Sequence, residues 1–278
     1  MVKIVTDSTA DIPPDLGAGI TVVPCYVQFG TSSYLDGIDI TRDQFYNRLA
    51  KSDVMPQTAA PSVGIFESIY RSVAGRDDEV ISIHVASTLS TVFNSAQLGA
   101  RAVDPDRITV YDSETVTMAL GWMCLAAARA ARQGKSAAQI IALLDNMKTR
   151  AHVFAALDTL EFLRRSGRVS WARAMMGQLL NVKPVVGVYR GVVRLLDRVR
   201  TRTRSIQRLV DLATSLGPIE SLAVLHTTAQ ETAQQLAHNL ASLVPTPIPI
   251  VEVTPVIGTH VGLNGLGLAL VVAREVQP

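Results

Sequence analysis

Short runs rich in β-branched residues alternate with longer helical patterns through the first half of the chain. Several of these runs are apolar at every position, as expected for parallel strands that are buried on both faces. The predicted strands are at 3–6, 21–26, 79–84, 107–111 and 153–157, and the predicted helices at 41–52, 62–74, 90–103, 115–133 and 136–149. This order predicts an α/β domain with a mainly parallel sheet that helices cover on both faces.

The pattern changes after about residue 158. Two short helical pieces precede a predicted hairpin around Arg190-Gly191, and helices then alternate with strands. The predicted strands are at 182–188, 192–200, 221–226 and 248–253, and the predicted helices at 203–216 and 229–243. At roughly 150 residues per domain, 278 residues favour two domains. We expect an N-terminal α/β domain over 1–157 and a smaller α/β domain with a mixed sheet over 158–278.

The composition is that of a folded protein, with 48% hydrophobic and 18% charged residues. The longest apolar stretches, 118–128 and 262–273, are shorter than the roughly 18 to 20 residues that cross a bilayer. The first residues lack the basic and apolar regions of a secretory signal. We therefore expect no transmembrane segment and a cytoplasmic location.

Several common catalytic and cofactor motifs are absent from the sequence. There is no G-x-x-x-x-G-K-[ST] loop for a nucleotide, no G-x-G-x-x-G after an early strand and no G-x-S-x-G elbow. Cys25 and Cys124 lack the spacing of a metal site or disulfide framework, and both are expected to be buried. No metal and no cofactor are predicted.

Arginine is concentrated between Arg190 and Arg208, a segment that contains seven arginines and only one acidic residue, Asp197. Such a segment is either a solvated surface or a docking surface for an acidic protein or nucleic acid. The chain has 14 aromatic residues, and only Tyr189 lies beside this segment. Because stacking platforms are missing, we do not expect nucleic-acid binding.

Three loops carry polar side chains where a ligand could bind. Hydroxyl groups lie before one predicted helix at 57–62 and before the next at 86–96, and His260 lies within a glycine-rich turn at 258–262. Hydroxyls at a helix start either cap the helix or bind an anion there. Taken singly, each loop allows both interpretations.

Together, these loops belong to a series of motifs that runs nearly from end to end of the chain. The series comprises Val5-Thr6-Asp7-Ser8-Thr9-Ala10-Asp11, Tyr34-Leu35-Asp36-Gly37, Thr58-Ala59-Ala60-Pro61-Ser62, 87–96, Tyr111-Asp112-Ser113, 159–170, 180–184 and 198–202. In this order and spacing it resembles the DegV family of bacterial fatty-acid-binding proteins. The chain departs from the family pattern at Ala59, Ala60, Thr91, Ser166 and Leu263-Asn264.

The resemblance implies a long-chain fatty acid, such as palmitate or oleate, in an apolar tunnel that the C-terminal domain closes. By position, Thr58, Ser90, Thr91 and His260 would bind its carboxylate. The supporting residues would be Asp7, Ser8, Ser62, Ser87 and Arg168. Hydroxyls and helix-start N–H groups suit a carboxylate because they supply donors without burying a full positive charge.

The resemblance also implies a partner, an ATP-dependent fatty-acid kinase that converts the bound carboxylate to an acyl phosphate. The chain itself would not be an enzyme but would present the substrate, with a role in lipid transport or fatty-acid metabolism. Arg200 and Arg202 would dock the kinase. The alternative is a serine-dependent acyl hydrolase that uses Ser90 and His260.

Overall fold

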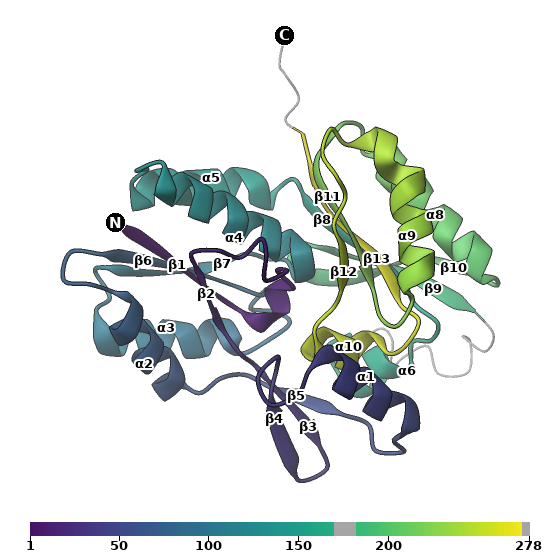
Figure 1. The fold of residues 1–278 in the computed structure, drawn as a ribbon, viewed down its shortest axis with the longest axis horizontal. Coiled ribbons are helices and arrows are strands. Elements are labelled where there is room, and N and C mark those ends of the chain that lie inside the picture. The colour runs from purple at the N-terminus through teal and green to yellow at the C-terminus, as the bar shows by residue number, and fades with distance from the viewer. Residues whose placement is uncertain (170–181, 274–278) are drawn as a thin grey trace.

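The computed structural model describes residues 1–169 and 182–273, which form two main sheets and one small sheet (Figure 1). Of the two short helical pieces predicted after residue 158, the first is α6 (Glu161–Ser166). The second, together with Ser170, Leu180 and Asn181 of the matched motifs, lies outside the described residues.

The first main sheet is entirely parallel, as predicted. Its order is β2-β1-β6-β7, formed by β1 (Val2–Asp7), β2 (Ile20–Val23), β6 (Glu79–His84) and β7 (Ile108–Asp112). One face carries α2 (Val63–Val73) and α3 (Val92–Val103), and the other carries α4 (Thr117–Arg132) and α5 (Ala137–Lys148) (Figure 1). The predicted three-layer arrangement of the first domain is therefore confirmed.

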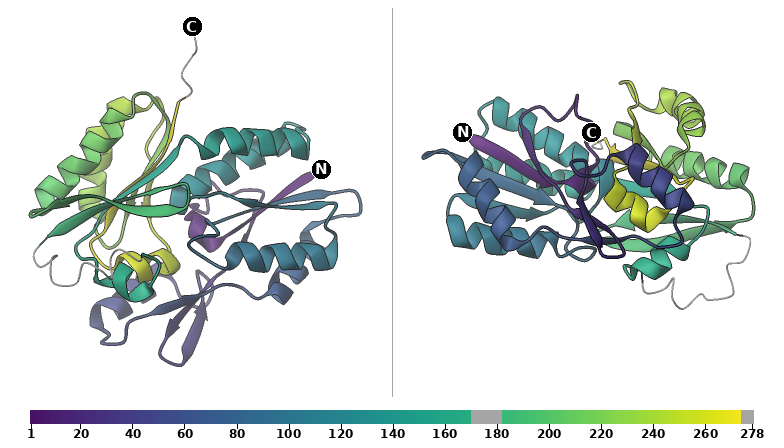
Figure 2. Two further views of the ribbon diagram at one scale, coloured as in Figure 1. Left: turned by 180° about the vertical axis from the view of Figure 1, so that it is seen from behind. Right: turned by 60° about the horizontal axis from the view of Figure 1, so that its bottom comes forward.

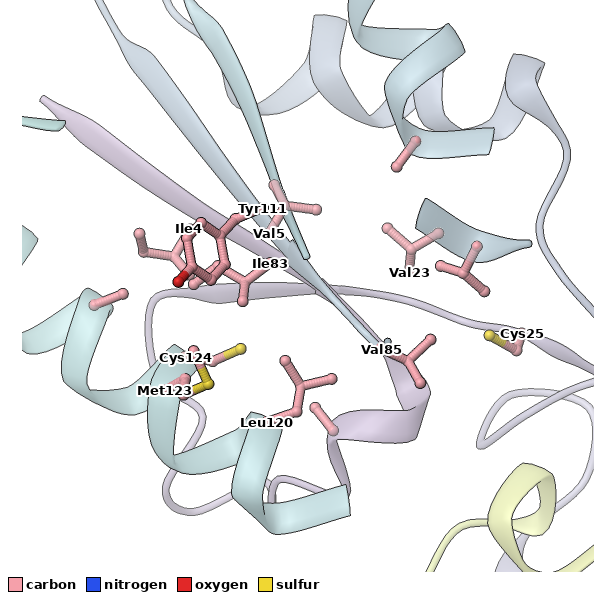
Figure 3. Close-up of a cluster of buried hydrophobic side chains, with 14 of the residues drawn as sticks. Ile4, Val5, Val23, Cys25, Ile83, Val85, Tyr111, Leu120, Met123 and Cys124 are labelled. Carbon is pink, nitrogen blue, oxygen red and sulfur yellow. The ribbon is translucent and has the colours of Figure 1, made fainter. Parts of the chain in front are cut away.

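Part of the core of this domain lies between the sheet and α4, as Figure 3 shows. Leu120, Met123 and Cys124 point from α4 toward sheet residues that include Ile4 and Ile83. Each of these side chains is almost completely buried. Burial of such side chains contributes roughly 1.5–3 kcal/mol apiece, so this layer is a main source of stability. Both cysteines are free and buried, as expected.

A small antiparallel sheet extends from the first domain and was not predicted. The run at 21–26 is interrupted at Pro24, which cannot donate a ladder hydrogen bond. The chain leaves the parallel sheet there and forms the sheet β4-β3-β5 from β3 (Tyr26–Phe29), β4 (Ser32–Leu35) and β5 (Gln57–Ala59). The helix α1 (Arg42–Lys51) follows β4 and begins with a capping box formed by Thr41 and Gln44. A short 3-10 helix, η1 (Ser8–Ala10), follows β1.

The second main sheet is mixed, as predicted. Its order is β10-β9-β8-β13-β11-β12, from β8 (Ala151–Ala156), β9 (Lys183–Tyr189), β10 (Val192–Val199), β11 (Ile219–His226), β12 (Ile250–Glu252) and β13 (Leu266–Val272). β11 and β12 are parallel, the other neighbours antiparallel. One face is covered by α8 (Arg202–Ser215) and α9 (Gln230–Leu240), which η2 (Ala241–Leu243) continues (Figures 1 and 2). The hairpin around Arg190-Gly191 is confirmed.

Two strands of this sheet differ from the prediction. We expected the strand near 153–157 to end the first domain, but β8 pairs with β9 and β13 in the second sheet. The change of sheet therefore precedes Ala151 rather than following residue 157. An apolar strand has the same composition in either sheet, so its partners cannot be inferred locally. The strand β13, which lies between β8 and β11, was not predicted. Its sequence begins beside several glycines, which are unfavourable in strands.

The glycine-rich segment 258–262, which we expected to be a turn, is largely helical. It forms the last part of α10 (Pro255–Val261), whose first residue is a proline, as is common at helix starts. Gly258 allows close packing, because a Cβ there would lie 2.6 Å from the Tyr46 hydroxyl. Gly262, with φ of 76°, ends the helix.

Candidate ligand-binding site

A cavity of about 340 Å³ lies between the two domains. It falls within the range of about 300–1,000 Å³ that is typical of small-molecule sites. One wall is the face of the second sheet opposite α8 and α9. The other wall comes from loops at the carboxyl ends of β6 and β7 and from β5.

The sheet wall of the cavity is apolar because of strand alternation. Val153 and Ala155 of β8 line the cavity, and Val188, the partner of Val153 on β9, lies beside them. The intervening Phe154 and Ala156 belong to the core beneath α8 and α9. The same strand therefore supplies a helix-covered core with one set of side chains and a ligand cavity with the other.

The pair Thr58 and His260 lies at the polar part of the cavity, with Thr58 Oγ1 3.1 Å from His260 Nε2. Burial lowers the pKa of His260 to about 3, and the positive charge of Arg168 acts in the same direction. The imidazole is therefore neutral at neutral pH. Neutral His260 carries one N–H and Thr58 one O–H, and their mutual bond uses only one of these hydrogens. The other hydrogen takes no part in this bond, and His260 Nδ1 is buried with no hydrogen-bond partner.

Ser90 and Thr91 line the cavity at the start of α3. Ser90 Oγ accepts a hydrogen bond of 3.3 Å from the Val92 N–H, which leaves its own O–H free to donate elsewhere. The Thr91 side chain makes no capping bond. A helix start favours negative charge, so the capping and ligand-binding interpretations of this loop are compatible.

The described residues that line the cavity include one cationic side chain and no anionic one. Arg168 is the one arginine or lysine among the described residues that line it, and its guanidinium donates to the Ser166 carbonyl at 2.6 Å. No aspartate or glutamate lines the cavity in the part of the chain that the structure describes. The five predicted residues Thr58, Ser90, Thr91, Arg168 and His260 thus meet in an environment that suits an anionic group.

The other predicted supporting residues do not line this cavity. Ser62 is exposed and caps α2 by accepting the Ile65 N–H at 3.4 Å. Ser87 is also exposed, and its N–H donates to the Asp112 carboxylate. Asp7 and Ser8 are buried, and Ser8 Oγ accepts the Cys25 N–H at 3.1 Å. The hydrogen bonds of these four residues stabilise loops and a helix start outside the cavity.

Asp7 belongs to a buried network that the sequence did not indicate. His84 Nδ1 donates to Asp7 at 2.9 Å, and His84 Nε2 lies 2.7 Å from Ser82 Oγ. Burial raises the pKa of Asp7, but the hydrogen bonds from His84, Thr9 and Val85, with the charge of His84, leave it lowered. Ser82 and His84 are completely buried, so this serine, histidine and aspartate tie strand ends together and do not face a substrate.

A second cavity, of about 500 Å³, is lined by acidic residues that sequence reasoning also missed. Burial raises the pKa of Asp11 to about 7 and that of Asp36 to about 6, while the positive charge of Arg42 lowers both. Asp11 accepts the Thr254 N–H at 2.7 Å, at the start of α10. The first domain thus holds the helix that carries His260. Both aspartates lie in the matched motifs, but no residue pattern assigned them a role.

No group of three or more His, Cys, Asp or Glu side chains among the described residues is arranged to hold a metal ion.

The two predicted docking arginines differ in environment. Arg200 is exposed just after β10, beside the exposed Arg198. Arg202 begins α8, is half-buried and lies 3.8 Å from Asp158. The basic surface is therefore formed mainly by β10 and the start of α8.

Ser90 and His260, the residues of the hydrolase alternative, have other hydrogen-bond partners. Ser90 Oγ accepts from Val92, and His260 Nε2 faces Thr58. Within the described residues, no carboxylate is hydrogen-bonded to His260. A nucleophile, a base and an orienting acid are thus not assembled here.

The fold and the candidate site are those of a two-domain α/β protein. Its apolar cavity has hydrogen-bond donors at one part of its lining. No helix of the described residues is long and apolar enough to cross a membrane. A family model described as "Uncharacterised protein, DegV family" matches residues 1–273. The chain belongs to the DegV family.

Similar proteins match nearly the whole length of the chain. Protein DegV of Bacillus subtilis is 33% identical, with 96% of this chain and 98% of that protein covered. The structure titled "Fatty Acid Binding of a DegV family Protein from Thermus thermophilus" has a TM-score of 0.90 and 29% identity, covering 98% of this chain and 99% of that one. A stearic acid-binding protein from Eubacterium ventriosum has a TM-score of 0.89 and 26% identity, covering 98% of each chain.

Proposed function

We propose that this protein binds a long-chain fatty acid such as palmitate or oleate in the cavity between its domains. The carboxylate would lie at Thr58, Ser90, Thr91 and His260, with Arg168 at the same cavity. The observation that carries the proposal is an apolar cavity without acidic residues, among those described, that has unused hydrogen-bond donors at one part.

The apolar wall would provide most of the affinity. At about 0.8 kcal/mol per buried methylene, a dozen buried groups contribute on the order of 10 kcal/mol before ordering costs. The polar residues would select the headgroup, because a carboxylate removed from water needs donors. The fatty acids named for the Thermus and Eubacterium proteins support this ligand class.

The second part of the proposal is that the protein is a carrier and not an enzyme. It would present the bound carboxylate to an ATP-dependent fatty-acid kinase in the cytoplasm, in lipid transport or fatty-acid metabolism. Arg200 and Arg202 would contact an acidic surface of that kinase. The exposure of Arg200 and of neighbouring arginines on β10 supports this, since exposed charges steer association.

The test is direct identification of the ligand. We expect organic extraction of the purified, denatured protein to release about one fatty acid per chain, and delipidated protein to bind added palmitate or oleate. Absence of lipid in repeated preparations, together with no binding of either acid, would overturn the proposal. Hydrolysis of acyl esters that disappears in Ser90→Ala would instead establish the hydrolase.

A further inference from the structure

The turn of the β9–β10 hairpin makes a close contact with the first domain. Gly191 is buried, although hairpin turns usually face solvent. The Thr88 hydroxyl donates to the Gly191 carbonyl at 2.5 Å, and the Gly191 N–H donates to the Glu114 carbonyl at 2.6 Å. One residue of the second domain thus joins two loops of the first.

Both of these loops line the cavity. Thr88 precedes Ser90 and Thr91 in the loop between β6 and α3, and Glu114 lies in the loop between β7 and α4, just before the cavity-lining residue Val116. The hairpin itself contributes Val186, Val188 and Val193 to the opposite wall. The Gly191 contact therefore joins the loop that carries Ser90 and Thr91 to the hairpin that carries part of the apolar wall.

The connection from β7 to Thr117, the first residue of α4, has a backbone that needs external support. Glu114 and Thr117 have φ values of 53° and 56°, in the left-handed region that a β-branched residue such as Thr117 rarely adopts. Such conformations persist only where surrounding contacts hold them. The hydrogen bond from Gly191 to Glu114 is one such contact.

Residue 191 must be glycine for the contact to form. Its φ is 71°, and a Cβ would lie 2.6 Å from Thr88 Oγ1 and 3.3 Å from the Ala86 Cβ. The turn is therefore shaped to receive the threonine hydroxyl rather than simply to reverse the chain.

We propose that Thr88 is a positioning residue for the carboxylate site: through Gly191 it holds the loop that carries Ser90 and Thr91 against the hairpin. This inference rests on the proposed function. It adds that headgroup recognition depends on a contact between the domains that does not touch the ligand. Thr88 acts through Ser90 and Thr91, whereas the apolar wall acts on the chain of the ligand.

The experiment compares oleate with methyl oleate, which has the same chain but no carboxylate. Thr88→Val removes the hydroxyl with little change of shape, and Thr88→Ser keeps it. We expect Thr88→Val to weaken oleate binding about tenfold, because it removes the partly buried hydrogen bond that holds the loop to Gly191, and to leave methyl oleate unchanged. Thr88→Ser should bind oleate like the wild type. Thr109→Val, at an exposed threonine of β7, is the matched control and should change neither affinity.

Gly191→Ala provides a second approach from the other side of the contact. It should reproduce the selective loss for oleate, because its added methyl group displaces Thr88. Equal losses for both ligands in Thr88→Val would mean a general structural role, and no loss for either would mean no role; each overturns the inference. If the wild type binds neither ligand, the proposed function itself fails, and the inference fails with it.

Discussion

The two main sheets are covered in different ways, and the difference locates the site. The first sheet has helices on both faces, whereas α8 and α9 cover only one face of the second. Part of the second sheet's other face packs on α4, where Trp122 Nε1 donates to the Ala269 carbonyl at 3.2 Å. Ile257 of α10 also packs on this face, and the remainder lines the cavity. The cavity thus lies where helices cover this face only in part, and a ligand there would complete the second domain's core.

The domains also differ in chemistry. Thr58, Ser90 and Thr91 come from the first domain, on a short strand and a helix start. Most of the apolar wall comes from strands of the second. Under the proposed function, this division would assign headgroup selection mainly to one domain and binding of the acyl chain mainly to the other. The following substitutions test the division, from the largest expected effect to the smallest.

A charge on the apolar wall should abolish binding. Val193 lines the cavity, while its neighbour Val192 is 46% exposed on the other side of β10. We expect Val193→Asp to weaken fatty-acid binding at least about hundredfold, because an unpaired buried carboxylate costs several kcal/mol. Val192→Asp is the control and should bind normally. Circular dichroism checks the fold, and normal binding by a folded Val193→Asp would remove this strand from the site.

The acidic contact at the start of α10 should make stability depend on pH. Burial raises the pKa of Asp11 to about 7 and that of Asp36 to about 6, above the ordinary value of 3.8. The folded state therefore holds these protons more tightly than the unfolded state. Their contribution to the free energy of unfolding falls as pH rises from about 4 to about 7, and then levels off.

Replacement by asparagine should remove this dependence. We expect Asp36→Asn to increase the free energy of unfolding by on the order of 1–3 kcal/mol at pH 8 and to change it little at pH 4. Asp11→Asn keeps an acceptor for the Thr254 N–H and should act in the same direction. Urea unfolding at pH 4, 6 and 8 is the measurement. Parallel pH profiles for the wild type and both variants would contradict the prediction.

The polar pair should contribute less than the wall. We expect Thr58→Val and His260→Ala each to weaken fatty-acid binding by roughly 1–3 kcal/mol, as should Ser90→Ala. Because Thr58 and His260 are hydrogen-bonded, their double variant should lose less than the sum of the single losses. Titration of the four proteins with oleate measures the coupling. Strict additivity would mean that the two residues act separately, and no loss in any variant would mean that they serve only the fold.

The basic surface should have no effect on lipid binding. Replacement of both Arg200 and Arg202 by glutamate should leave oleate affinity unchanged and slow acyl-phosphate formation by a partner kinase. The wild-type reaction should weaken as salt rises, since exposed charges are screened over about 8 Å at physiological ionic strength. Turnover with lipid-loaded protein at two salt concentrations is the measurement. Normal turnover would identify these arginines as a solvated surface, and lost lipid binding would show that they support the cavity.

Local patterns predicted most elements of the fold but not the partners of every strand. The parallel strands, the capped helices and the Arg190-Gly191 hairpin each carry a signal within a few residues. The sheet membership of β8 depends on β13, far away in the sequence, and no local pattern encodes it. Pro24 is a local signal for the break between β2 and β3, although a single strand is predicted at 21–26.

The candidate site was predictable where motifs contain its polar residues and not where contacts between distant segments create it. Thr58, Ser90, Thr91 and His260 were named from motifs, and the structure brings all four to one cavity. Ser62 and Ser87 share the same hydroxyl-rich loops but face solvent, because side-chain direction depends on the local turn. The Asp11 contact with α10 joins residues 243 positions apart, so it could be found only in the folded chain.

The central position of β13 has a consequence for the order of folding during synthesis. Ala156 at the end of β8 pairs with Leu266, so one edge of β8 stays open until the ribosome has released nearly all of the described chain. Open strand edges are prone to wrong pairing, and contacts this distant in sequence form slowly. The first domain, whose sheet ends at Asp112, can be completed much earlier. The cavity therefore forms last, and a ligand bound as proposed would enter it after synthesis and not during synthesis.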